Sequence, residues 1–126
     1  DGWEAPQLIE IGGAALEGTY YSTHYSPEDN SPAVQGFGML YRARFGGETP
    51  DAMAALGYDS AFFLADAIKR AGVTDPAAVR AALAATKDFT GVTGHTTIDV
   101  NRNASKAAVI VTVKDGSFKF FETVAP

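Results

Sequence analysis

Four prolines, each followed by an apolar segment, divide the first ninety residues of this chain into helices. They are Pro6, Pro32, Pro50 and Pro76. Proline is favoured at the first position of a helix, because its missing N–H has no partner to lose there. The residues before the last three, Ser31, Thr49 and Asp75, are of the types that cap helix N-termini. The pattern therefore predicts one short helix and three longer ones.

Glycines set the expected ends of these helices, since glycine readily adopts the left-handed conformation that follows a last helical turn. They are Gly12-Gly13, Gly46-Gly47 and Gly72. The second helix gathers its apolar side chains on one face, namely Val34, Phe37, Tyr41 and Phe45. The third, over residues 50–72, is apolar around most of its circumference and is predicted to be largely buried.

The β-strands are expected in two separate places along the chain. The segment TYYST, residues 19–23, is rich in residues that favour strands. GHTTIDV, residues 94–100, is also expected to be a strand, and a hairpin is expected around Asp115-Gly116, a favoured two-residue turn. The order helix, strand, three helices, three strands indicates an α/β or α+β domain.

Composition excludes several classes of function. The chain has 126 residues and a net charge of −5, so a nucleic-acid partner is not expected. No apolar run reaches the length of about 18 residues that a membrane helix needs. Cysteine is absent, which excludes disulfides, thiolate metal sites and cysteine nucleophiles.

Candidate metal and catalytic motifs are weak. Asp99, Asn101 and Asn103 have the spacing of a calcium loop, but Ala104 replaces its glycine, so an Asx-rich turn is favoured. The two histidines are isolated in sequence, and no nucleophile elbow or phosphate-binding loop is present. We therefore predict no metal, no cofactor and no catalytic residue, and an enzyme is the less favoured interpretation.

Several segments together resemble the C-terminal portion of bacterial branched-chain amino-acid-type (leucine/isoleucine/valine-binding-like) solute-binding proteins, the periplasmic receptors of ABC importers. The most specific are DGW at 1–3, TPDAMAALGYD at 49–59 and LADAIKRAG at 64–72. The resemblance runs nearly end to end but covers only the last third of the family's length. It implies an α/β fragment of a type I, Venus-flytrap protein with two Rossmann-like lobes and crossing hinge strands.

The same resemblance implies how the fragment, residues 1–126, is divided. Residues 1–24 and 110–126 belong to the second lobe, and residues 25–109 belong to the first. The segments STHYS and AAVIV then become crossing strands between the lobes. Closure about such a hinge is the family's mechanism.

The resemblance also implies three ligand-binding residues. Asp1 takes the role of the acid that binds the α-ammonium of an amino-acid ligand, and a carboxylate in a closed cleft suits that role. Trp3 lies beside it and walls the cleft or serves a structural role. Met53 occupies a position where the family places an apolar side chain near the ligand's side chain, with core packing as the alternative.

The implied function is that of the solute-binding component of an ABC importer, non-enzymatic and periplasmic. Its implied partners are an amino acid, branched-chain or related, the missing N-terminal part of the receptor, and a membrane permease. Three outcomes stay open for the uncovered faces: the missing part is supplied separately, copies pair or swap, or the fragment has been adapted to stand alone. One alternative function is an isolated or engineered fragment that self-associates and binds no ligand. Another is an enzyme or sensory domain with the same fold.

Overall fold

The computed structural model describes residues 2–3 and 5–126. The helices, in chain order, are α1 (Pro6–Gly12), the 3₁₀ helix η1 (Gly13–Leu16), α2 (Pro32–Arg44), α3 (Ala52–Ala71) and α4 (Pro76–Ala84). The strands are β1 (Tyr20–Thr23), β2 (Phe89–Gly91), β3 (Gly94–Ile98), β4 (Ala104–Ser105), β5 (Ala108–Lys114) and β6 (Ser117–Val124). None of the described helices combines the length and apolarity needed to span a membrane.

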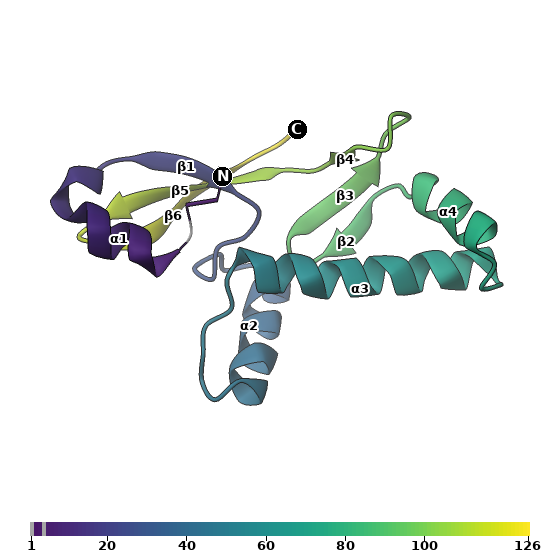
Figure 1. Cartoon of the computed structure of the whole chain (residues 1–126), viewed down its shortest axis with the longest axis horizontal. Helices are drawn as coiled ribbons and strands as arrows, with labels where there is room; N and C mark the ends of the chain where they lie inside the picture. Colours follow the sequence, from purple (N-terminus) through teal and green to yellow (C-terminus); the bar gives the residue numbers. More distant parts are fainter. Residues whose placement is uncertain (1, 4) are drawn as a thin grey trace.

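One antiparallel sheet, the terminal sheet, joins the two ends of the chain in the order β1-β5-β6. Strand β1 pairs with β5, with Tyr20 opposite Thr112. The β5–β6 hairpin turns at Asp115 and Gly116, whose φ angles of 52° and 65° are both positive, as this two-residue turn requires. Helix α1 and η1 lie beside this sheet (Figure 1).

The core of the terminal sheet follows from the alternation expected in β5. Val109, Val111 and Val113 are buried, since side chains two residues apart point to the same face of a strand. Tyr21 of β1 packs with the first two of these, and Phe118 and Phe120 of β6 lie against them.

The second sheet, the central sheet, has the order β2-β3-β4 and lies with α3 and α4 in the other part of the molecule (Figure 1). A separate apolar cluster holds α2 against the start of α3. Its members are Tyr25, Val34, Phe37, Ala52 and Ala55, all buried. The chain thus has two cores, one in each part, joined by residues 24–31 (the first connection) and 106–107 (the second connection).

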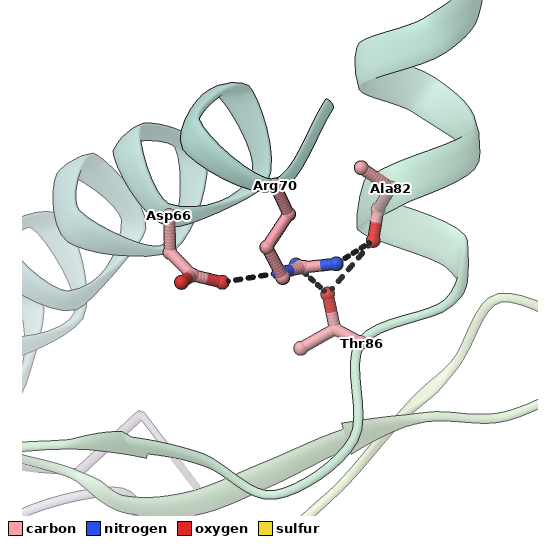
Figure 2. A network of polar contacts seen from close by, with 4 residues as sticks. All are labelled: Asp66, Arg70, Ala82 and Thr86. Atoms are coloured by element: carbon pink, nitrogen blue, oxygen red, sulfur yellow. Dashed lines mark hydrogen bonds and ion pairs between the residues drawn. The ribbon is translucent and has the colours of Figure 1, made fainter. Parts of the chain in front are cut away.

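Arg70 ties the end of α3 to α4 (Figure 2). Its Nε contacts Asp66 Oδ2 at 2.7 Å within the same helix. Its two terminal nitrogens donate to the carbonyl of Ala82 and the hydroxyl of Thr86, both at 2.7 Å. Thr86 is buried, so this guanidinium satisfies polar atoms that water reaches poorly.

Most helix boundaries agree with the sequence, but the start of α3 does not. Ser31 and Asp75 cap α2 and α4, each accepting from a backbone N–H three residues on. Thr49 was expected to cap α3; instead, the side chain of Asp51 accepts from the backbone N–H of Ala54 at 2.8 Å. Pro50 therefore lies before the helix, because the cap residue follows it.

The prediction that α3 is largely buried is wrong. Only Ala52, Ala55 and Ala67 of its 20 residues are buried. Phe62 and Leu64 are 54% and 46% exposed. Phe45, which follows the last residue of α2, is exposed too, although its ring contacts that of Tyr41. Within the described part of the chain, these apolar side chains stay exposed.

Candidate functional site

The N-terminal segment is held to the terminal sheet by a row of aromatic rings. The centroid of the Trp3 ring lies 6.3 Å from that of Tyr21, with the planes inclined by 44°. Tyr21 in turn makes an edge contact with Phe118, at 5.7 Å between centroids. Trp3 keeps 45% of its surface exposed, so one part of the ring packs on the sheet and another is free to meet a further group. Asp1, the predicted ammonium partner, lies outside the described residues.

Met53 belongs to the other part of the molecule. It lies in the first turn of α3, two residues after the capping residue Asp51. Its side chain is 63% exposed, so it does not pack in the core of this chain. The ring contact of Trp3 is with Tyr21 rather than with α3. The structure therefore places Trp3, which packs on β1, and Met53, on α3, on either side of the first connection.

The first connection is bonded to both parts. Glu28 Oε1 forms an ion pair with Lys119 Nζ on β6 at 2.9 Å, and Glu28 Oε2 accepts from the backbone N–H of Phe120 at 2.9 Å. The side chain of Gln35, on α2, donates to the carbonyls of Pro27 and Asp29. The hydrogen bond from Lys119 is the largest of the effects that lower the pKa of Glu28. The first connection thus contacts the terminal sheet through Glu28. It contacts α2 through the carbonyls of Pro27 and Asp29.

The second connection is bonded to the turn between β2 and β3. Lys106 Nζ donates to Thr93 Oγ1 at 2.6 Å, and that hydroxyl donates to Asp59 Oδ2 of α3 at 2.7 Å. Burial lowers the pKa of Lys106, and the nearby Asp59 carboxylate partly opposes this effect. Hydrogen bonds through Thr93 therefore link Lys106, two residues before β5, to Asp59 of α3.

Asp59 also positions the β2–β3 turn. Its carboxylate accepts from the backbone N–H groups of Val92 and Thr93, both at 2.8 Å. A Cβ atom at Gly91 would collide with this carboxylate, so only glycine fits at that position. Asp59 closes the TPDAMAALGYD segment that carries the family resemblance, but the sequence alone did not indicate which groups it binds.

A hollow of about 790 Å³ opens between α3, α4 and the central sheet. Its walls are mainly apolar and include Leu56, Phe63 and Leu64 of α3 and Phe89 and Ile98 of the strands. Arg80, Arg102 and Lys106 also line it. We call this feature the α3 hollow.

No cluster of the described residues offers three or more histidine, aspartate or glutamate side chains to one metal ion. The predicted Asx-rich turn is present: Asp99 Oδ1 accepts from the backbone N–H groups of Asn101 and Asn103, both at 2.8 Å. His95 contacts Asp88 at the exposed surface. Asp99 and His95, which had been considered as metal ligands, therefore bond to neighbouring groups of the protein.

Comparison with known proteins identifies the chain's family. A family model described as "Periplasmic binding protein" matches residues 2–117. The chain belongs to the periplasmic binding protein family. No curated protein sequence matches this periplasmic binding protein chain.

Solved structures extend the match across the chain. A leucine-binding protein, LivK, from Thermotoga maritima is 42% identical and covers 100% of this periplasmic binding protein chain, with a TM-score of 0.87. The branched-chain amino acid transporter substrate-binding protein LivJ from Streptococcus pneumoniae, solved with isoleucine, is 32% identical over 100% of the chain, with a TM-score of 0.81. A putative branched-chain amino acid ABC transporter protein from Rhodospirillum rubrum is 32% identical over 93%, with a TM-score of 0.77.

The chain spans only 36% of the length of LivK and of LivJ, and 34% of the Rhodospirillum rubrum protein. These matches confirm both the family resemblance and the α/β fold of type I periplasmic binding proteins that the sequence implied. LivK is described as a leucine-binding protein, and LivJ as the substrate-binding protein of a transporter.

Proposed function

We propose that the chain is part of the solute-binding component of an ABC importer, and that it binds a branched-chain or related amino acid by closure of two lobes about a hinge. The ligands of the relatives, leucine for LivK and isoleucine for LivJ, support the substrate class. The single observation that carries the proposal is the end-to-end match to LivK at 42% identity.

The division into lobes at 1–24 and 110–126, with 25–109 between, is part of the proposal. The separate terminal and central sheets support it. The apolar cluster of the terminal sheet is also distinct from the one between α2 and α3. Strand β5 begins at Ala108, so the boundary at 109/110 falls inside that strand. Two connections pass between the sheets (Figure 1), which suits a hinge whose segments flex while the sheets stay intact.

Asp1, Trp3 and Met53 are the proposed ligand-binding residues. Asp1 binds the ammonium group of the amino acid, because a carboxylate is the natural partner of a desolvated ammonium. The partly exposed ring of Trp3 and the exposed side chain of Met53 support contact with a further group. Trp3 packs on Tyr21 of β1, before the first connection, and Met53 lies on α3, after it, which suits a cleft between lobes.

The test of this function is calorimetric titration of the complete receptor, the chain with the rest of the two-lobed fold. We expect saturable heat with leucine, isoleucine or valine at one site, and weak or no heat with lysine or aspartate. Absence of binding for every neutral apolar amino acid contradicts the proposed substrate class. The proposed setting is the periplasm, and the proposed further partner is the importer's permease.

The second candidate is a self-associating fragment without ligand binding. It is favoured by exposed apolar side chains on α2 and α3, namely Met39, Leu40, Met53, Phe62 and Leu64. Apolar faces of this kind are covered by another surface in stable proteins. Light scattering on a sizing column separates the candidates: a dimer that binds no amino acid favours self-association, and a mass near 13.2 kDa opposes it.

A further inference from the structure

The later residues of the first connection form a turn that is bonded to α2. Asp29 donates its backbone N–H to the carbonyl of Ser26, and its carboxylate accepts from the backbone N–H of Ser31, the residue that caps α2. Gln35, in the first turns of α2, donates to the carbonyls of Pro27 and Asp29 at 3.2 and 2.6 Å. A segment with this many bonds to a helix opens less readily than a free loop. The turn is therefore expected to move together with α2.

Glu28 carries bonds from this turn to the other part of the molecule. Its Oε1 atom pairs with Lys119 Nζ, and its Oε2 atom accepts from the backbone N–H of Phe120, both at 2.9 Å. Among the described strands β6 lies at the edge of the terminal sheet, and its pairing with β5 shifts register immediately after Phe120. One carboxylate thus holds a side chain and a backbone donor at an irregular point of an edge strand.

The second connection also moves with the helices, because Lys106 bonds through Thr93 to Asp59 of α3. Strand β5 begins two residues after Lys106, and its residue Val109 pairs with Thr23, the last residue of β1. Both connections therefore reach the terminal sheet at the same end of the β1–β5 pair. Segments that meet a sheet at one end can act together as a hinge for its rotation.

We propose that Glu28 is a latch across this hinge. It belongs to a turn that moves with α2, it fixes β6 in the orientation that the structure has, and it has to release β6 for the two parts to rotate. The inference rests on the proposed function, because it takes that rotation as the working motion of the receptor. It adds a residue that restrains the motion and is not one of the proposed ligand-binding residues.

The latch contact is of a kind that can open and close repeatedly. The side chains of Glu28 and Lys119 keep 40% and 46% of their surface exposed. Water therefore replaces each bond as it breaks, whereas separating a buried ion pair would leave uncompensated charges. The latch accordingly shifts the balance between lobe orientations without preventing either of them.

Distances between two spin labels, measured by pulsed electron paramagnetic resonance on the complete receptor without amino acid, test the latch. This chain has no cysteine, so Ser117→Cys on β6 and Ala77→Cys on α4, both exposed, place one label on each side of the hinge. Glu28→Ala removes both latch bonds. Glu122→Ala is the matched control, because Glu122 is an exposed acid of the same strand β6 and takes no part in the latch.

We expect one narrow distance distribution for the original receptor and for Glu122→Ala, and a distribution about twice as wide, or a second maximum, for Glu28→Ala. Lys119→Met removes the ammonium group but keeps the Phe120 N–H, so it should widen the distribution less. The variant with both Glu28→Ala and Lys119→Met should be no wider than Glu28→Ala alone, because the two side chains act through one contact. Circular dichroism confirms that each variant is folded.

Three results overturn the proposal: an unchanged distribution in Glu28→Ala, equal widening in Glu28→Ala and Glu122→Ala, or a double variant wider than both single ones. Leucine is then added to the original receptor as a separate step. A distribution that widens in Glu28→Ala but does not shift with leucine supports the latch and contradicts only the proposed function.

Discussion

The Glu28 carboxylate joins the first connection to β6 through an ion pair with Lys119, with 2.9 Å between Oε1 and Nζ. The same carboxylate accepts from the backbone N–H of Phe120. Gln35 holds the residues on either side of Glu28 to α2. A motion of the terminal sheet relative to α2 therefore has to reorganise this turn, which places Glu28 at the centre of the proposed hinge.

Replacing Glu28 by glutamine should cost about 0.5–1 kcal/mol of unfolding free energy at neutral pH, the range of a partly exposed ion pair. The pKa of Glu28 is lowered in the folded state, so this stability is present above the ordinary pKa of glutamate and is lost as pH falls through the lowered pKa. Urea denaturation at several pH values measures the difference. Glu10→Gln, on exposed α1, is the control, and a pH-independent difference for Glu28→Gln contradicts the ion pair.

Asp59→Asn should destabilise the chain by about 1–3 kcal/mol, because the amide cannot accept from Val92, Thr93 and the threonine hydroxyl together. Thermal or urea unfolding measures this loss. Glu48→Gln, an exposed acid before α3, should change stability by less than about 0.5 kcal/mol. Equal effects of the two substitutions would show that Asp59 does not hold the β2–β3 turn.

Arg70→Ala should cost about 1–2 kcal/mol, since it removes the bonds to Asp66, Ala82 and Thr86 that tie α3 to α4 (Figure 2). The neighbouring Lys69→Ala provides the control on the same exposed turn, with an expected change below about 0.5 kcal/mol. Hydrogen exchange of α4 amides should accelerate in Arg70→Ala only. Unchanged exchange there argues against the tie.

Asp1→Ala in the complete receptor should weaken amino-acid binding by about 2–5 kcal/mol, the loss expected when one partner of a buried charge pair is removed. Calorimetry with leucine measures it. Glu10→Ala serves as a control for the loss of one negative charge. An unchanged affinity removes Asp1 from the ligand site.

The local structure was largely predictable from the sequence because short-range chemistry decides it. Ser31 and Asp75 cap their helices, and Asp115-Gly116 turns the hairpin, as their residue types indicate. Thr49 was a wrong choice of cap because Asp51, two residues later, offers the better-placed acceptor. The three-residue strand β2 gave too short a pattern to be recognised.

The burial of α3 could not be predicted, because periodicity shows which faces are apolar but not whether the chain contains their cover. The polar tethers were also missed, since Glu28 and Lys119 are 91 residues apart and Asp59 and Thr93 are 34 apart. Of the candidate site, Trp3 packs on the terminal sheet and Met53 lies on α3, and their contact with a ligand stays a prediction.

The central claim is that an amino acid closes two lobes about the hinge, and small-angle X-ray scattering of the complete receptor tests it most directly. We predict that the radius of gyration decreases when leucine or isoleucine is added to saturation, and that lysine has no such effect. Scattering that is identical with and without the apolar amino acids, at concentrations that saturate the protein, would contradict closure on ligand.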